Sequence, residues 1–115
     1  MSTLNSQTDR LNEVLRDVED YFAGLGVGVP ASVPVDEGAS LAWKKHNGEW
    51  KLFVVLHPSD EEVPLLSAPR ARRVQATAKL EDLEDAVYLA ANKVSEEVDE
   101  AITRAVEFLA SRRPV

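Results

Sequence analysis

The sequence predicts an α+β domain with two layers, in which helices pack on a small antiparallel sheet. Three observations predict this class: helical periodicity over residues 6–25, a hairpin signal within residues 41–56, and a stretch of residues 70–111 without glycine or proline. At 115 residues the chain has the commonest size of a single domain, so we expect one folding unit.

An amphipathic helix is predicted over residues 6–25, because the apolar side chains recur at spacings of three and four. Ser6 or Thr8 is the expected N-cap, and Gly24 and Gly26 are the expected stop. The acidic residues fall on the opposite face, which we interpret as solvated surface. The apolar positions are Leu11, Val14, Leu15, Val18, Tyr21, Phe22 and Leu25.

Residues 27–40 are expected to form an extended connection. Two prolines, Pro30 and Pro34, disfavour a central strand there, because proline has no N–H to donate to a neighbouring strand. Residues 33–35 can still form a short edge strand.

The hairpin is the strongest local signal in the chain. Asn47-Gly48 separates two runs rich in aromatic and β-branched residues, and both residues tolerate the positive φ angles of a type I′ turn. A two-residue turn at this point fixes the register of the strands. The expected pairs are His46 with Glu49, Lys45 with Trp50, Lys44 with Lys51, Trp43 with Leu52, and Leu41 with Val54.

Side chains alternate between the two faces of this hairpin. One face collects large apolar residues, so we expect it to lie on the core and interpret Trp43 and Trp50 as core anchors, not as a stacking platform for ligands. The other face carries polar residues near the turn, with Phe53 and Val55 further along. The expected core face consists of Leu41, Trp43, Trp50, Leu52, Val54 and Leu56.

After a polar turn, residues 63–66 are expected to add a short strand, and Ser67 to cap a helix that begins near residue 68. Base rates of helix length favour two helices in the C-terminal half, over residues 68–92 and 96–112. The expected break lies near residues 92–95, where Ser95 is followed by acids as in a new helix N-terminus.

An eleven-residue repeat supports the opposite interpretation. Apolar residues recur at this period in two series, one of Leu80, Ala91 and Ile102 and the other of Val87, Val98 and Leu109. A period of about 3.67 residues per turn keeps an apolar stripe nearly straight along one unbroken helix. Such a helix would project beyond a domain of this size, and a second copy of the chain would cover it most easily.

Composition favours an ordinary folded protein, with 44% hydrophobic and 29% charged residues. The longest apolar run, residues 52–56, is too short to cross a bilayer, and the first residues do not show the pattern of a secretory signal. The chain has no cysteine, which excludes disulfides and zinc–thiolate sites. We therefore expect a cytoplasmic location and no membrane partner.

We expect no catalytic, cofactor-binding or metal-binding residues. The two histidines, His46 and His57, have no acid or histidine at ligand spacing on a shared element. The carboxylates gather on polar helix faces, and no calcium-loop, His-Glu-x-x-His or Gly-x-Ser-x-Gly pattern is present. The sequence thus predicts a protein that is not an enzyme.

Positive charge gathers in the middle of an otherwise acidic chain. The net charge of −7 divides into −5 for residues 1–43, +3 for residues 44–79 and −5 for residues 80–115. Lys44 opposite Lys51 costs stability unless an acid or an anion relieves it. The cations can contact an anion or nucleic acid, or pair with acids of the same chain or of a partner. Candidate contact residues are Lys44, Lys45, Lys51, Arg70 and Arg73, while Arg72 is expected to point elsewhere.

Three functions remain open at this point. The leading hypothesis is an interaction module without enzymatic activity that forms a homodimer through its C-terminal helices, or that binds another protein. The second is nucleic-acid or anion contact through the five cations, although an acidic chain is a poor general binder of nucleic acid. The third is an accessory subunit of an enzyme whose catalytic residues lie in a partner.

Overall fold

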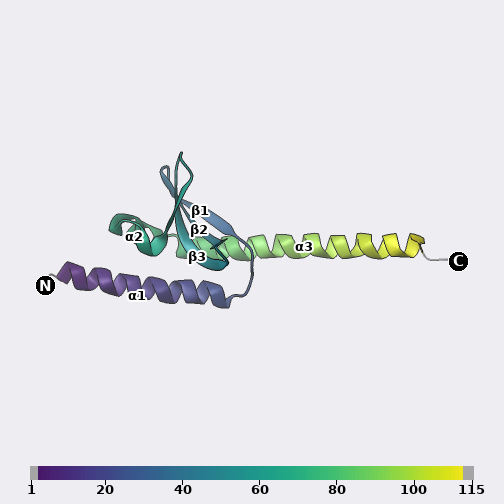
Figure 1. Cartoon of the computed structure of the whole chain (residues 1–115), viewed down its shortest axis with the longest axis horizontal. Helices are drawn as coiled ribbons and strands as arrows, with labels where there is room; N and C mark the ends of the chain where they lie inside the picture. The colour runs from purple at the N-terminus through teal and green to yellow at the C-terminus, as the bar shows by residue number, and fades with distance from the viewer. Residues whose placement is uncertain (1–2, 113–115) are drawn as a thin grey trace.

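The α+β prediction is confirmed by a computed structural model of the chain, which describes residues 3–112. A long helix precedes a sheet of four strands, and two helices follow it (Figure 1). The elements are α1 (Thr3–Gly24), β1 (Ala31–Asp36), β2 (Ala39–His46), β3 (Glu49–Leu56), β4 (Glu61–Pro64), the 3₁₀ turn η1 (Leu65–Ser67), α2 (Arg70–Thr77) and α3 (Leu80–Arg112).

The predicted hairpin is confirmed as β2 and β3. Asn47 and Gly48 form its turn, with φ angles of 51° and 84°. Every predicted pair is present, from His46 opposite Glu49 to Leu41 opposite Val54. The turn residues and the alternation of side chains therefore specify the centre of the sheet.

The two predicted flanking strands are also present, with shifted bounds. β1 pairs with β2 and β4 with β3, so the strand order is β1-β2-β3-β4 and all pairs are antiparallel. Pro34 lies in β1 at the edge of the sheet, and the pairing register shifts between Pro34 and Asp36. Proline and an irregular register both oppose pairing with a further strand.

The core lies between one face of the sheet and the two long helices. α1 packs on β3, and α3 packs on β1 and β2. Trp43 is buried and stacks on Trp50 with 5.9 Å between ring centroids, which confirms their interpretation as core residues. The buried residues that meet here include Leu15, Phe22, Leu41, Trp43, Leu52, Val54, Leu65, Ala76, Leu83 and Val87.

Phe53 is buried on the opposite face of the sheet and is not part of the core cluster. Ala42 and Pro64 are its partners on the neighbouring strands, and the ring of His46 meets it edge-on at 5.8 Å between centroids. Val55 is half-buried. These neighbours on the sheet contribute to the cover over Phe53.

The N-cap expected at Ser6 or Thr8 is wrong, because α1 already begins at Thr3 and both residues lie inside it. The Thr8 hydroxyl donates to the carbonyl of Leu4 at 2.9 Å, one helical turn earlier. Serine and threonine form such bonds within helices as well as at caps. Their identity alone did not locate the start of α1.

The N-cap expected at Ser67 is also wrong. Residues 65–67 form the 3₁₀ turn η1, and Pro69 occupies the N-cap position of α2 without a side-chain cap. Ala68 is extended, with φ −72° and ψ 158°, as expected of a residue before proline. The proline thus delays the helix to Arg70.

The break expected near residues 92–95 is contradicted, because α3 is continuous from Leu80 to Arg112. The chain instead turns between α2 and α3, where the N–H of Lys79 donates to the carbonyl of Ala76 at 2.9 Å. This turn allows both Ala76 and Leu83 to be fully buried. The alternative drawn from the eleven-residue repeat is therefore confirmed for residues 80–112. No described helix has the length and apolar character that a membrane crossing requires.

Two polar contacts join the C-terminal half of α1 to the rest of the domain. The Tyr21 hydroxyl donates to the carboxylate of Glu84 on α3, and this bond raises the pKa of Tyr21 to about 12. The backbone N–H of Leu52 donates to Glu19 Oε2 at 2.9 Å. Pairing between β3 and β4 ends at Phe53, so Glu19 supplies a partner for Leu52 just beyond the last strand pair.

Replacement of Glu19 by alanine is expected to destabilise the domain. Glu19→Ala removes the acceptor for the part-buried N–H of Leu52, and an unpaired buried donor costs about 1–3 kcal/mol. Urea unfolding followed by tryptophan fluorescence measures the change in unfolding free energy. Asp20→Ala, an exposed acid on the same helix, is the matched control. Equal losses for the two variants would contradict a specific role of Glu19.

Candidate interaction surface

The C-terminal part of α3 extends away from the domain (Figure 1). Ala91 is its last half-buried residue, and every residue from Asn92 to Arg112 is exposed. At 1.5 Å per residue this projecting segment, residues 92–112, is about 30 Å long. It makes the molecule elongated, with principal extents of 81 × 30 × 25 Å.

The projecting segment exposes many large apolar side chains. Ile102, for example, keeps 56% of its surface accessible. Surface of this kind on a soluble protein typically marks an interaction site. The exposed large apolar residues of the segment are Val94, Val98, Ile102, Val106, Phe108 and Leu109.

These side chains continue the face by which α3 enters the core. Leu80, Leu83 and Val87 follow spacings of three and four inside the domain. The same spacing continues beyond it and defines an apolar stripe, while Val106 and Phe108 lie at its edges. The residues of this stripe are Val94, Val98, Ala101, Ile102, Ala105 and Leu109.

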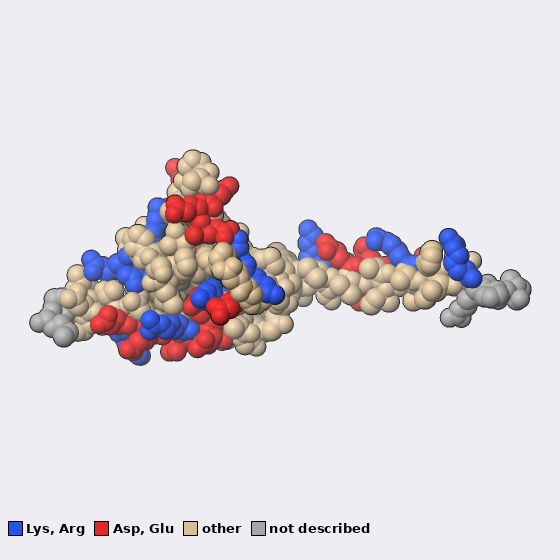
Figure 2. All heavy atoms as spheres, viewed as in Figure 1, with Lys and Arg blue, Asp and Glu red and all other residues tan. Residues whose placement is uncertain are grey.

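Between Lys93 and Glu107, the charged residues of the projecting segment lie on its opposite side or along the edges of the stripe. Figure 2 shows them along one side of the helix, with uncharged residues along the other. In the same view α1 lies on the uncharged side of α3, and it ends before the projecting segment begins (Figure 1). The segment is therefore amphipathic, and beyond α1 its apolar side has no cover within the described chain.

Charge is unevenly distributed along the segment. Residues 96–100 contain four acids, whereas residues 103–112 contain Arg104, Glu107 and Arg112. Arg104 pairs with Glu100 at 3.3 Å on the same helix. An exposed pair of this kind contributes only a few tenths of a kcal/mol, so these charges remain available to a partner.

The hairpin cations are placed beside acids. Lys44 and Lys51 face each other as predicted. Lys44 pairs with Glu62 on β4, and Lys51 pairs with Glu49 at 3.2 Å on its own strand. Both members of the like-charge pair therefore have an acid that relieves their repulsion. Lys45, opposite Trp50 and near the turn, is exposed.

The candidate arginines lie on α2, apart from the lysines of the hairpin. Arg70 is exposed at the first residue of the helix, whereas Arg73 donates to Asn12 Oδ1 on α1. Arg72 points elsewhere, as expected, and pairs with Asp36 at 2.9 Å. The N–H of Gly38 and then the Arg72 guanidinium hold the pKa of Asp36 below its usual value. The contacts thus divide the five candidate cations between the hairpin and α2.

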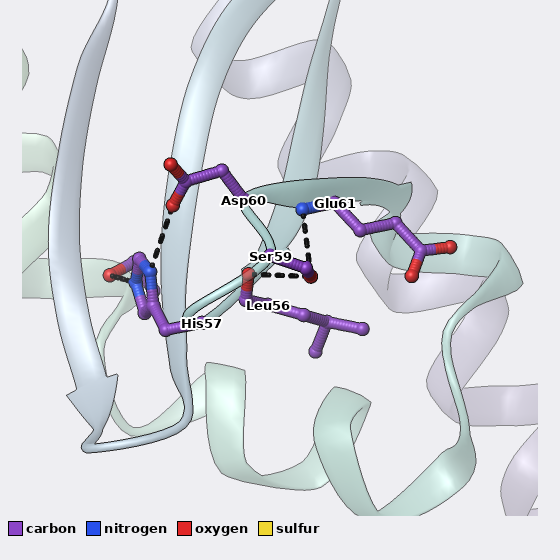
Figure 3. A network of polar contacts seen from close by, with 6 residues as sticks. Leu56, His57, Ser59, Asp60 and Glu61 are labelled. Atoms are coloured by element: carbon purple, nitrogen blue, oxygen red, sulfur yellow. Dashed lines mark hydrogen bonds and ion pairs between the residues drawn. The ribbon is translucent and has the colours of Figure 1, made fainter.

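The two histidines lie at opposite ends of the hairpin, and His57 joins a polar network. Ser40 Oγ and His57 Nε2 are 2.9 Å apart, and His57 Nδ1 is 3.3 Å from Asp60 Oδ1. Figure 3 shows His57 and Asp60 directed toward each other across the turn after β3. A second contact in this turn runs from the N–H of Glu61 to Ser59 Oγ at 3.3 Å.

A serine, a histidine and an aspartate in this order resemble the hydrogen-bond chain of serine hydrolases. Acyl transfer also needs an enclosed site with donors directed at the oxyanion. Here the Asp60 side chain is 79% exposed. Within residues 3–112, no group of three or more His, Asp or Glu side chains could hold a metal ion. We therefore interpret the network as a structural contact that holds the turn after β3 against β2.

Three of these contacts were not predicted from the sequence: Ser40 with His57, Glu19 with Leu52, and Arg72 with Asp36. Each joins residues 17 or more positions apart, so local spacing gave no signal for it. The eleven-residue repeat was the signal for the projecting segment.

Comparison with models of protein families, with curated proteins and with solved structures found no match to this chain. The surface of α3 is therefore the feature from which a function can be inferred.

Proposed function

We propose that this protein is an interaction module without enzymatic activity, which forms a two-fold dimer through the projecting segment of α3. The observation that carries the proposal is the apolar stripe, which leaves the core and continues uncovered for about 16 residues, from Val94 to Leu109. A helix of this length needs tertiary or quaternary contacts for most of its stability.

A second copy of the chain is the occupant that the segment itself favours. An identical helix presents the same apolar stripe, and small alanines at positions 101 and 105 allow two helices to approach closely. In a two-fold dimer each copy covers the other, so both stripes are buried at once. The proposal includes a cytoplasmic location, which the absence of cysteine supports.

The solution mass of the intact chain tests this proposal. Light scattering during size exclusion, at two salt concentrations and micromolar protein, should give twice the chain mass of 12.7 kDa at both. Apolar contacts are little affected by salt, which screens exposed charges. Absorbance at 260 nm on the same peak reports bound nucleic acid, and we expect none.

Two results would overturn the proposal. A monomer at both salt concentrations would show that the stripe does not bind a second copy. A peak that carries nucleic acid, which salt then removes, would instead favour contacts through Lys44, Lys45, Lys51, Arg70 and Arg73.

A further inference from the structure

The proposed dimer can pair its two α3 helices in parallel or antiparallel orientation. We infer that the helices pair antiparallel, with the two-fold axis passing level with the midpoint between Ala101 and Ile102. This inference rests on the proposed self-association and adds its geometry. Packing, length and charge each support it independently.

Packing is complementary in this register. Antiparallel pairing about that axis places residues whose numbers sum to 203 at the same level. Val94 then lies level with Leu109 of the other copy, Val98 with Ala105, and Ala101 with Ile102. Every residue of the apolar stripe meets another residue of the stripe, and two of the three pairings set a large side chain beside a small one. Parallel pairing would set Ala101 and Ala105 beside their own copies and leave space there.

The length of the helix fits the same axis. In this register Ala91 lies level with Arg112 of the other copy. Ala91 is also the residue at which the domain stops covering α3. The described helix of each copy therefore reaches the domain of the other without entering the space that α1 and the sheet occupy.

Charge disfavours the parallel alternative. In a parallel pair the acidic residues 96–100 would lie beside their own copies, four acids against four within about one Debye length. In the antiparallel register these residues face residues 103–107, which contain Arg104 and Glu107 and have no net charge. Glu97 and Arg104 lie along the same edge of the stripe at about 3.6 residues per turn, so they approach each other twice across the antiparallel dimer.

Cysteine cross-linking tests the orientation, and the chain contains no cysteine of its own. We would prepare Val94→Cys and Leu109→Cys separately, then oxidise each variant alone and the two after mixing. In the antiparallel dimer two copies of Val94 are about 22 Å apart along the axis, from 15 residues at 1.5 Å each, which is too far for a disulfide. The mixture should therefore cross-link several-fold more than either variant alone.

Two other outcomes are also decisive. Efficient cross-linking of Val94→Cys and of Leu109→Cys alone would indicate a parallel dimer; this overturns the inference and leaves the proposed function intact. Ile102→Cys lies near its own copy in either orientation, so it reports the interface itself. If Ile102→Cys does not cross-link and the mass is that of a monomer, both proposals fail. Thr103→Cys, on the polar side at the same level, measures cross-linking by random collision.

Discussion

Ile102→Glu is expected to convert the dimer into a folded monomer. Ile102 lies at the centre of the apolar stripe, so the substitution places two carboxylates, one from each copy, next to the proposed axis. A charge buried without a partner costs several kcal/mol, and each 1.4 kcal/mol changes a dissociation constant tenfold. We expect the dissociation constant to rise by at least about a hundredfold. Light scattering should then give the monomer mass of 12.7 kDa.

The matched control is Thr103→Glu, which introduces the same side chain one position away on the polar side. It should remain a dimer. Both variants should keep the cooperative unfolding of the domain, because residues 102 and 103 make no contact with the core cluster. Thr103→Glu should also keep its circular dichroism, whereas Ile102→Glu should lose part of its helical signal, because the projecting segment then lacks the contacts that stabilise it. A dimeric Ile102→Glu variant, or dissociation of Thr103→Glu alone, would place the interface on another face.

The sheet was predictable because its signals are local. Asn47 and Gly48 select the turn, and the alternation of side chains fixes which face meets the core. The flanking strands were harder to bound, since residues 31–36 and 61–64 obtain their pairing from β2 and β3. Local sequence specifies the hairpin, whereas β1 and β4 are defined by their pairing with it.

The division of the C-terminal half into helices was not predictable from local signals. No glycine or proline marks the turn between α2 and α3; what sets it is the burial of Ala76 and Leu83 on either side. Ser95 followed by acids has the composition of a helix start, but those residues are exposed and nothing in the described chain interrupts α3 there. Side chains that suit a cap are equally compatible with an exposed helix surface.

The candidate surface was predictable in part, because the apolar repeat of α3 is the same in its buried part and in its exposed part. The repeat of Leu80, Ala91 and Ile102 predicts one straight stripe, but it does not say where the domain stops covering it. That limit depends on how far α1 and β1 extend along α3 (Figure 1). One pattern therefore belongs to the core in its first third and to the proposed interface in the rest.

This division predicts a large difference in stability between two leucines of α3. Leu83 is 0% exposed and Leu89 is 73% exposed. Leu83→Ala removes side-chain contacts and leaves a cavity between α3 and the sheet, which costs about 2–5 kcal/mol. Leu89→Ala makes the same chemical change on solvated surface, where substitutions stay within about 0.5 kcal/mol.

Both substitutions should be made in the Ile102→Glu background. The unfolding free energy of a dimer depends on protein concentration, whereas that of a monomer does not. Urea unfolding followed by the fluorescence of Trp43 and Trp50 then reports the domain alone. A loss for Leu83→Ala close to the expected range, with little change for Leu89→Ala, would show that the first turns of α3 are part of the folding core. Similar small losses for both would mean that the sheet and α1 fold without α3, and that the whole of α3 depends on the second copy for its stability.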